Sequence, residues 1–176
     1  MKTIEITLYN FKELSQEAQK KALNELAYTN VEYCNWWEST YYDAENIGLK
    51  IDGFDIDRRS YLNAEFVDSA YSTANKIVKE HGNGCTTYKI SKEFITNWDD
   101  LVSKYSDGNF LKEVLQENND KFDSEADELE TDYLNSLCNE YLKMLRNEYE
   151  YLTSEKAIIE TIEANEYDFT IDGKQY

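Results

Sequence analysis

The 176-residue sequence predicts an α+β protein in which an antiparallel sheet of about four strands packs with helices. Short segments near the start, before residue 70 and at the C-terminal end alternate polar and apolar residues, which is typical of half-buried strands. Stretches with an apolar residue at every third or fourth position separate them and predict amphipathic helices. We therefore expect an α+β core over residues 1–116, an acidic helical region inserted over 117–166, and a C-terminal strand over 167–176 that returns to the core sheet.

The first elements are a strand and two helices. Residues 3–9 alternate in polarity and predict the strand. Ser15 is a suitable N-cap for a helix that reaches about Tyr28. A second helix is expected over 31–47, and Gly48 follows it where a residue with positive φ can end a helix.

A hairpin follows. Apolar residues over 49–56 predict a strand whose alternation changes phase at Asp52 and Gly53, which indicates a β-bulge. Residues 57–60 can turn the chain into a partner strand over 61–67.

Helices predominate after the hairpin. Asp68 is a suitable N-cap for a helix over residues 69–81, which Gly82 ends. After a turn at Asn83-Gly84, Ser91 caps the next expected helix. Asp107-Gly108 breaks that helix, and a short one is expected over residues 110–115.

The longest periodic stretch covers residues 124–152. Its apolar stripe repeats almost every four residues and consists of Leu129, Tyr133, Leu137, Tyr141, Leu145, Tyr149 and Leu152. Such a helix would be about 42 Å long at 1.5 Å per residue. A further helix is expected over 155–164, and residues 167–171 alternate again as the last strand.

Negative charge is concentrated in the helical region. The chain has 36 acidic and 18 basic residues, a net charge of −18. Residues 117–166 hold 15 acidic and 4 basic residues, more than half of that excess in under a third of the chain. This charge disfavours direct binding to nucleic acid or to anionic membranes, because both require basic clusters. It indicates a basic protein as partner, with plain solubility as the alternative explanation.

Acidic residues interleaved with tyrosines on the long helix are the candidate contacts for that partner. A tyrosine offers a large contact area at low entropic cost, and carboxylates would meet lysine and arginine. For Tyr133, Tyr141 and Tyr149 a place in the helix core is the alternative. The predicted binding residues are Asp127, Glu128, Glu130, Asp132, Glu140, Glu148, Glu150 and Tyr151.

Three separated cysteines, Cys34, Cys85 and Cys138, form no CxxC pair and are expected to be reduced. The N-terminus has no apolar signal segment, and no run approaches the ~20 apolar residues of a membrane helix. We therefore expect a protein of the cytoplasm.

Catalytic signatures are weak, and we predict no enzyme activity and no cofactor. The sequence contains no phosphate-binding loop, nucleophile elbow or HExxH helix. Two alternatives stay open: His81, the single histidine, could pair with a cysteine, Cys85 above all. Asp52, Asp55 and Asp57 could hold a weak Mg²⁺ ion, although they lack the spacing of a calcium loop.

About the first half of the chain, residues 3–95, resembles a family of small phage and prophage proteins, some of them labelled antitoxin-like. The residues that carry the likeness are Glu13–Gln19, Trp37, Asp43-Ala44, Ile47–Ile51, Phe54–Arg58, Ala74, His81-Gly82 and Thr87–Lys89. The resemblance implies a phage-encoded protein that acts in a bacterial cell, and small acidic phage proteins often counter host defences. It favours an anti-CRISPR type of inhibitor that mimics DNA and binds a nucleic-acid-handling host protein. An antitoxin that neutralises a basic toxin is the alternative.

Overall fold

A computed structural model describes residues 5–106 and 115–176 and confirms an α+β fold. The chain divides into two compact units. The central unit comprises Glu38–Leu145, and the terminal unit comprises the residues up to Trp37 together with Arg146–Tyr176. One boundary between the units falls within the long helix, between Leu145 and Arg146, whereas boundaries near residues 116 and 166 were expected.

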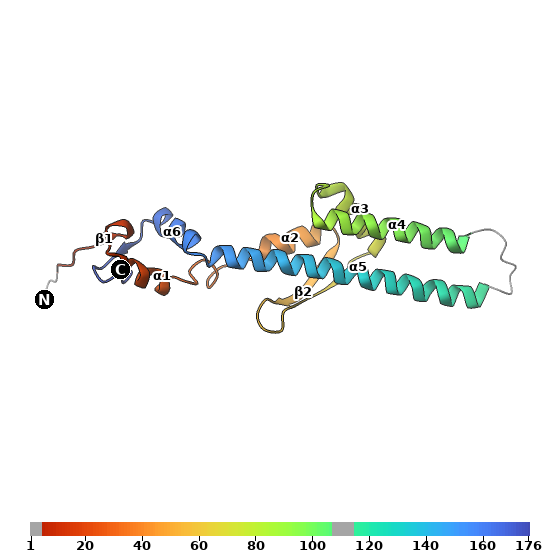
Figure 1. The fold of residues 1–176 in the computed structure, drawn as a ribbon, viewed down its shortest axis with the longest axis horizontal. Coiled ribbons are helices and arrows are strands. Elements are labelled where there is room, and N and C mark those ends of the chain that lie inside the picture. Colours follow the sequence, from red (N-terminus) through yellow and green to blue (C-terminus); the bar gives the residue numbers. More distant parts are fainter. Residues whose placement is uncertain (1–4, 107–114) are drawn as a thin grey trace. The chain divides into compact units, whose positions relative to one another are not determined.

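The terminal unit joins the two ends of the chain. Strand β1 (Tyr9–Asn10) pairs antiparallel with β4 (Asp168–Phe169), and the short 3-10 helix η1 (Phe11–Glu13) follows β1. Helices α1 (Gln16–Glu25) and α6 (Glu155–Ala164) pack together beside them (Figure 1). The last strand therefore pairs with the first strand of the chain, in a sheet of these two strands alone among the described residues. The buried core of this unit is Phe11, Leu14, Ala18, Ala22, Leu26, Ile158, Ile162 and Phe169.

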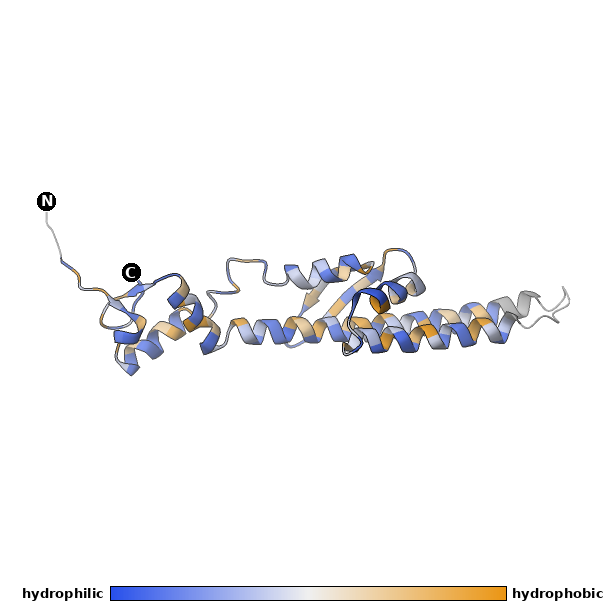
Figure 2. Ribbon diagram, turned by 90° about the horizontal axis from the view of Figure 1, so that it is seen from above, coloured by the Kyte–Doolittle hydropathy of each residue, from blue (hydrophilic) through white to orange (hydrophobic). Residues whose placement is uncertain are grey.

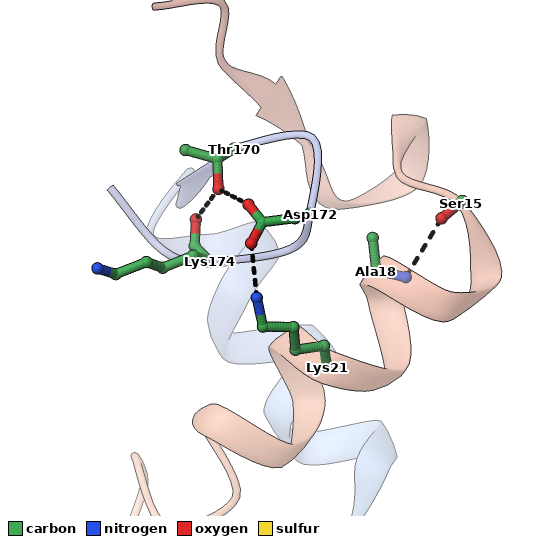
Figure 3. Close-up of polar contacts among 6 residues, drawn as sticks. All are labelled: Ser15, Ala18, Lys21, Thr170, Asp172 and Lys174. Carbon is green, nitrogen blue, oxygen red and sulfur yellow. Dashed lines mark hydrogen bonds and ion pairs between the residues drawn. The ribbon is translucent and has the colours of Figure 1, made fainter.

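A turn near the C-terminus packs directly on α1 (Figure 3). Asp172 accepts a 2.6 Å hydrogen bond from Thr170 and forms a 2.6 Å ion pair with Lys21 of α1. Gly173 has φ +84°, and a Cβ atom there would lie 2.1 Å from the carbonyl oxygen of Ala18. Only glycine suits this position, since a side chain would meet both an unfavourable backbone conformation and the backbone of α1.

The central unit is built on a hairpin of β2 (Leu49–Asp55) and β3 (Tyr61–Phe66), with α2 (Glu38–Asn46) before it. The register shifts between Ile51 and Gly53, which confirms the expected bulge. Helix α3 (Ala70–Glu80) packs on α4 (Thr86–Ser106), and α4 runs beside the first part of α5 (Leu115–Leu152) (Figure 1).

Stacked aromatic rings fill the core between the hairpin, α4 and α5. The ring of Tyr133 lies parallel to Phe94 at 4.2 Å and to Phe66 at 5.6 Å, with 15° between the planes in both pairs. The expected apolar stripe of α5 is confirmed, since Tyr133, Leu137, Tyr141 and Leu145 are buried. Figure 2 shows apolar and hydrophilic residues alternating along α5, as an amphipathic helix requires.

The prediction of one sheet of about four strands was wrong, because each sheet in the described residues has two strands. The four strands form two separate two-stranded sheets, β1–β4 and β2–β3, where a single sheet was expected. Residues 5–8 of the expected first strand are not in a strand, and Ile6 is 51% exposed. The two-residue strand β4 offers hydrogen-bond partners only to Tyr9 and Asn10, so the alternating residues before them have none in β4.

The second helix also begins later than its pattern indicates, at Glu38 and not near residue 31. Side chains of the preceding segment are held by tertiary contacts within the terminal unit. Asn30 donates a 2.9 Å hydrogen bond to the carbonyl of Leu152 and accepts one of 2.7 Å from Thr161. The ring of Trp36 packs against that of Tyr149 at 5.5 Å. These contacts outweigh helix propensity over residues 31–37.

Two expected helix starts are corrected. Ser69, and not Asp68, caps α3, since its hydroxyl accepts a 3.1 Å hydrogen bond from the amide of Ser72. Ser91 lies inside α4, fully buried, with its hydroxyl 2.8 Å from that of Tyr133. The break and short helix expected over 107–115 fall mostly outside the described residues. By contrast, Ser15 and Ser154 cap α1 and α6, and α6 covers the expected residues 155–164.

Candidate partner-binding surface

All eight predicted binding residues lie on α5, but they belong to different units. In the central unit Asp127, Glu128 and Asp132 are exposed, whereas Glu130 and Glu140 are half-buried. In the terminal unit Glu148, Glu150 and Tyr151 are exposed. The structure therefore brings four of them together within two turns, over residues 127–132.

The acidic residues of α5 are crowded into its first half. Residues 115–132, here called the acidic segment, contain eight acidic residues and one basic residue. Residues 133–152 contain three acidic and two basic residues. At 1.5 Å per residue the acidic segment is about 27 Å long, which gives about one net negative charge per 4 Å. One strand of B-DNA carries one charge per ~3.4 Å along the helix axis, so the two linear densities are similar.

Among the residues that the structure describes, few of these charges are neutralised by an ion pair. Glu125 forms a 2.7 Å ion pair with Lys104, and hydrogen bonds from Lys104 and then Tyr105 lower the pKa of its carboxyl. Asp123, Asp127 and Glu128 form no ion pair with any residue that the structure describes. The exposed Asp120 and Asp123 extend the cluster of acidic side chains, although the sequence prediction did not single them out.

Two of the predicted residues have local roles. The hydroxyl of Tyr151 donates a 3.1 Å hydrogen bond to Glu160, which raises the pKa of the phenol. Burial, followed by the nearby charge of Asp127, raises the pKa of Glu130. Glu130 is therefore less suited to meet a partner than its exposed neighbours, because desolvation already disfavours its ionised form.

Glu140 lines a different feature, a cleft of about 530 Å³ near the single histidine. His81 Nε2 lies 3.6 Å from Oδ1 of Asp43, and Nδ1 lies 2.8 Å from Oγ1 of Thr87. Oδ2 of Asp43 accepts a 2.7 Å hydrogen bond from Tyr141. These side chains connect α2, the start of α4 and α5. Asp43 and Tyr141 gave no local sequence signal, because their contact joins residues 98 positions apart.

The described residues give no geometric support to a pairing of His81 with a cysteine or to a Mg²⁺ site at the hairpin aspartates. Cys85 lines the same cleft as His81, but among the described residues no hydrogen bond joins its thiol to the imidazole. Burial raises the pKa of the Cys138 thiol, which disfavours the reactive thiolate. Within the described residues no group of three or more potential ligands could hold a metal ion.

The aspartates of the hairpin instead shape the turn and pair with lysine. Oδ1 of Asp55 accepts a 2.7 Å hydrogen bond from the amide of Asp57, whose carbonyl accepts one of 3.1 Å from Ser60. Asp52 lies 3.2 Å from Nζ of Lys50. The two hydrogen bonds are ordinary for a hairpin turn, and the ion pair is ordinary for the solvated face of a hairpin.

Comparison of the chain with protein-family models, curated proteins and solved structures finds no match. None of the helices in the described parts of the chain has the length and apolar character needed to cross a lipid bilayer.

Proposed function

We propose that this chain is a binding protein whose acidic segment occupies the basic, nucleic-acid-binding groove of another protein. The observation that carries the proposal is the linear charge density of the segment, about one net negative charge per 4 Å of helix. A groove built to hold a phosphate backbone presents lysine and arginine at a similar spacing. The protein thus acts by competition with nucleic acid, and no residue is assigned a catalytic role.

The acidity has an energetic cost that such a role explains. A net charge of −18 opposes compaction through self-repulsion. The acidic segment adds to it, and most of its exposed carboxylates form no ion pair with a described residue. Unpaired exposed charges steer association with an oppositely charged partner, and they do so most strongly at low ionic strength. From the resemblance to phage proteins we further propose that the partner is a bacterial defence protein such as a CRISPR effector.

The test is capture from nuclease-treated bacterial lysate on the immobilised protein, at low and at high salt. We expect basic nucleic-acid-binding proteins to be retained at low salt and to be displaced by added duplex DNA. The variant D127N/E128Q should weaken capture several-fold, since it removes two exposed charges from the acidic segment. The matched control E148Q/E150Q removes two exposed charges from the second half of α5, and it should capture partner proteins as well as the unmodified protein does.

Each other outcome has a defined meaning. If captured proteins have no nucleic-acid-binding activity, or if DNA does not displace them, the proposal is wrong. If the retained protein is a basic toxin whose activity is suppressed and which does not bind nucleic acid, the antitoxin alternative replaces it. Equal losses in the two variants would show that net charge matters and that the acidic segment does not.

A further inference from the structure

A groove of about 240 Å³ lies between α4 and α5 in the central unit. Its floor includes Phe94 and Tyr133, each only 3% exposed, and Ile90 and Leu129, which are half-buried. The floor is therefore continuous with the core of the unit, and the polar side chains of Asn97 and Ser136 also line the groove.

Contacts around the floor hold it in one arrangement. The rings of Phe94 and Tyr133 stack at 4.2 Å, and Phe66 stacks on Tyr133 at 5.6 Å. The hydroxyl of Tyr133 is fixed by its 2.8 Å hydrogen bond with the buried Ser91. Because the stacked neighbours cover the ring faces of Tyr133, an occupant would meet the edges of the rings.

Two carboxylates from facing helices stand beside this floor. Glu93 of α4 and Asp132 of α5 both line the groove and are exposed. Neither forms an ion pair with any residue in the described parts of the chain. The groove thus combines apolar side chains with two carboxylates that no described residue pairs with, an arrangement that an amphipathic cation complements.

We infer that this groove receives an arginine side chain of the basic partner, an inference that rests on the function proposed above. The methylene stem of arginine lies along Ile90, Leu129 and the ring edges, while its charged head stays at the rim. The guanidinium offers five N–H donors in a planar fork, which can serve carboxylates on both sides. Lysine has a compact, strongly hydrated charge and matches two separate acceptors less well.

The cleft near His81 is a weaker candidate for the same ligand, because its carboxylates already have partners. Asp43 accepts from Tyr141 and faces His81, Glu80 lies 3.4 Å from Lys79, and Glu140 lies 3.8 Å from Lys143. A cation entering that cleft would have to displace these contacts. In the groove between α4 and α5, neither Glu93 nor Asp132 has an ion-pair partner among the described residues.

The experiment is an NMR titration of the intact protein with Nα-acetyl-arginine amide and, separately, with Nα-acetyl-lysine amide. The arginine ligand should shift the methyl resonances of Ile90 and Leu129 and the ring resonances of Phe94. The variant E93Q/D132N should weaken its binding roughly fivefold or more, since it removes both charged acceptors at nearly constant shape. The control E148Q/E150Q removes two exposed charges from the second half of α5, outside the groove, and should bind the arginine ligand within about twofold of the unmodified protein.

Two results would overturn the inference: shifts centred away from the groove, or equal binding of the arginine and lysine ligands. Unchanged affinity in E93Q/D132N would also overturn it, provided that the methyl spectrum of the variant is that of the folded protein. Failure of the arginine-binding inference can be told apart from failure of the proposed function by comparing partner capture in the two variants. Partner capture that is lost in D127N/E128Q but unaffected in E93Q/D132N would remove the arginine site and leave the acidic segment in place.

Discussion

The phenolic hydroxyl of Tyr141 donates a 2.7 Å hydrogen bond to Oδ2 of Asp43 and thereby joins α5 to α2. Tyr141 is fully buried, whereas the side chain of Asp43 is 42% exposed. Oδ1 of the same carboxylate faces His81. A single acidic residue of α2 thus has contacts with both the centre of α5 and the residue that ends α3.

Replacement of Tyr141 by phenylalanine tests this contact. We expect Y141F to lower the free energy of unfolding by about 1–2 kcal/mol, because a hydrogen bond to a charged acceptor is lost although water can still reach Asp43. Urea unfolding provides the measurement. The control Y42F alters a tyrosine that is 66% exposed and should change stability by less than about 0.5 kcal/mol. Equal effects of the two substitutions would show that the contact contributes nothing.

The buried pair of Ser91 and Tyr133 should show energetic coupling. In S91A the phenol loses its only described partner in a site that is 3% exposed, at a cost of about 1–3 kcal/mol. In Y133F the cost should be smaller, because a serine hydroxyl inside a helix can turn to the carbonyl four residues earlier. The double variant should cost less than the sum of the two. A double-mutant cycle measured by urea unfolding checks this, and strict additivity would contradict it.

Stability should fall at alkaline pH as the buried tyrosines ionise. Burial raises the pKa of Tyr133 to about 12, an effect that the Ser91 hydrogen bond partly offsets, and burial followed by Asp43 raises the pKa of Tyr141. Unfolded tyrosine has a pKa of about 10. Since the folded values are higher, this contribution is complete below about pH 10 and is lost as the pH rises toward 12. Urea unfolding across that window measures it, and Y133F/S91A should show a shallower decline.

Asp172 should titrate at low pH. The hydrogen bond from Lys21, then that from Thr170, lowers the pKa of its carboxyl to about 2. Because the folded value is depressed, the contribution of this pair to stability is present above the ordinary value of about 4 and is lost as the pH falls toward 2. NMR titration of the carboxyl should show the pKa rising in K21M. The control K20M changes a lysine that forms no ion pair with described residues, and it should leave the titration unchanged.

Gly173 should tolerate no side chain. In G173A the new Cβ would lie 2.1 Å from the carbonyl oxygen of Ala18, at a backbone φ of +84°. We expect a loss of about 2 kcal/mol or more and faster hydrogen exchange in α1, as the C-terminal turn moves away from it. The control G84A places a Cβ where no described atom lies within 4 Å. Similar exchange rates in the two variants would contradict the close packing.

The sequence predicted well those elements whose signals are local. The α5 stripe, the limits of α6, the Ser15 cap and the bulge near Gly53 follow from side-chain periodicity and backbone preference alone. It failed where a side chain has a distant partner. The sequence around Ser91 resembles a helix start, but in the structure the Ser91 hydroxyl is hydrogen-bonded to Tyr133 inside α4. Residues 31–37 match a helical pattern, but Asn30 bonds to Leu152 and Trp36 packs on Tyr149.

The candidate partner-binding surface likewise has features that the sequence predicts and features that depend on tertiary packing. The concentration of charge in residues 115–132 and the amphipathic character of α5 can be counted from the sequence, because each depends on residues close along one helix. Glu93 could not be associated with Asp132 in that way, since only the packing of α4 against α5 places both beside one groove. The sequence by itself determined the charge and the helix that carries it. The tertiary structure decided which carboxylates share a site, because that depends on contacts between residues far apart in the chain.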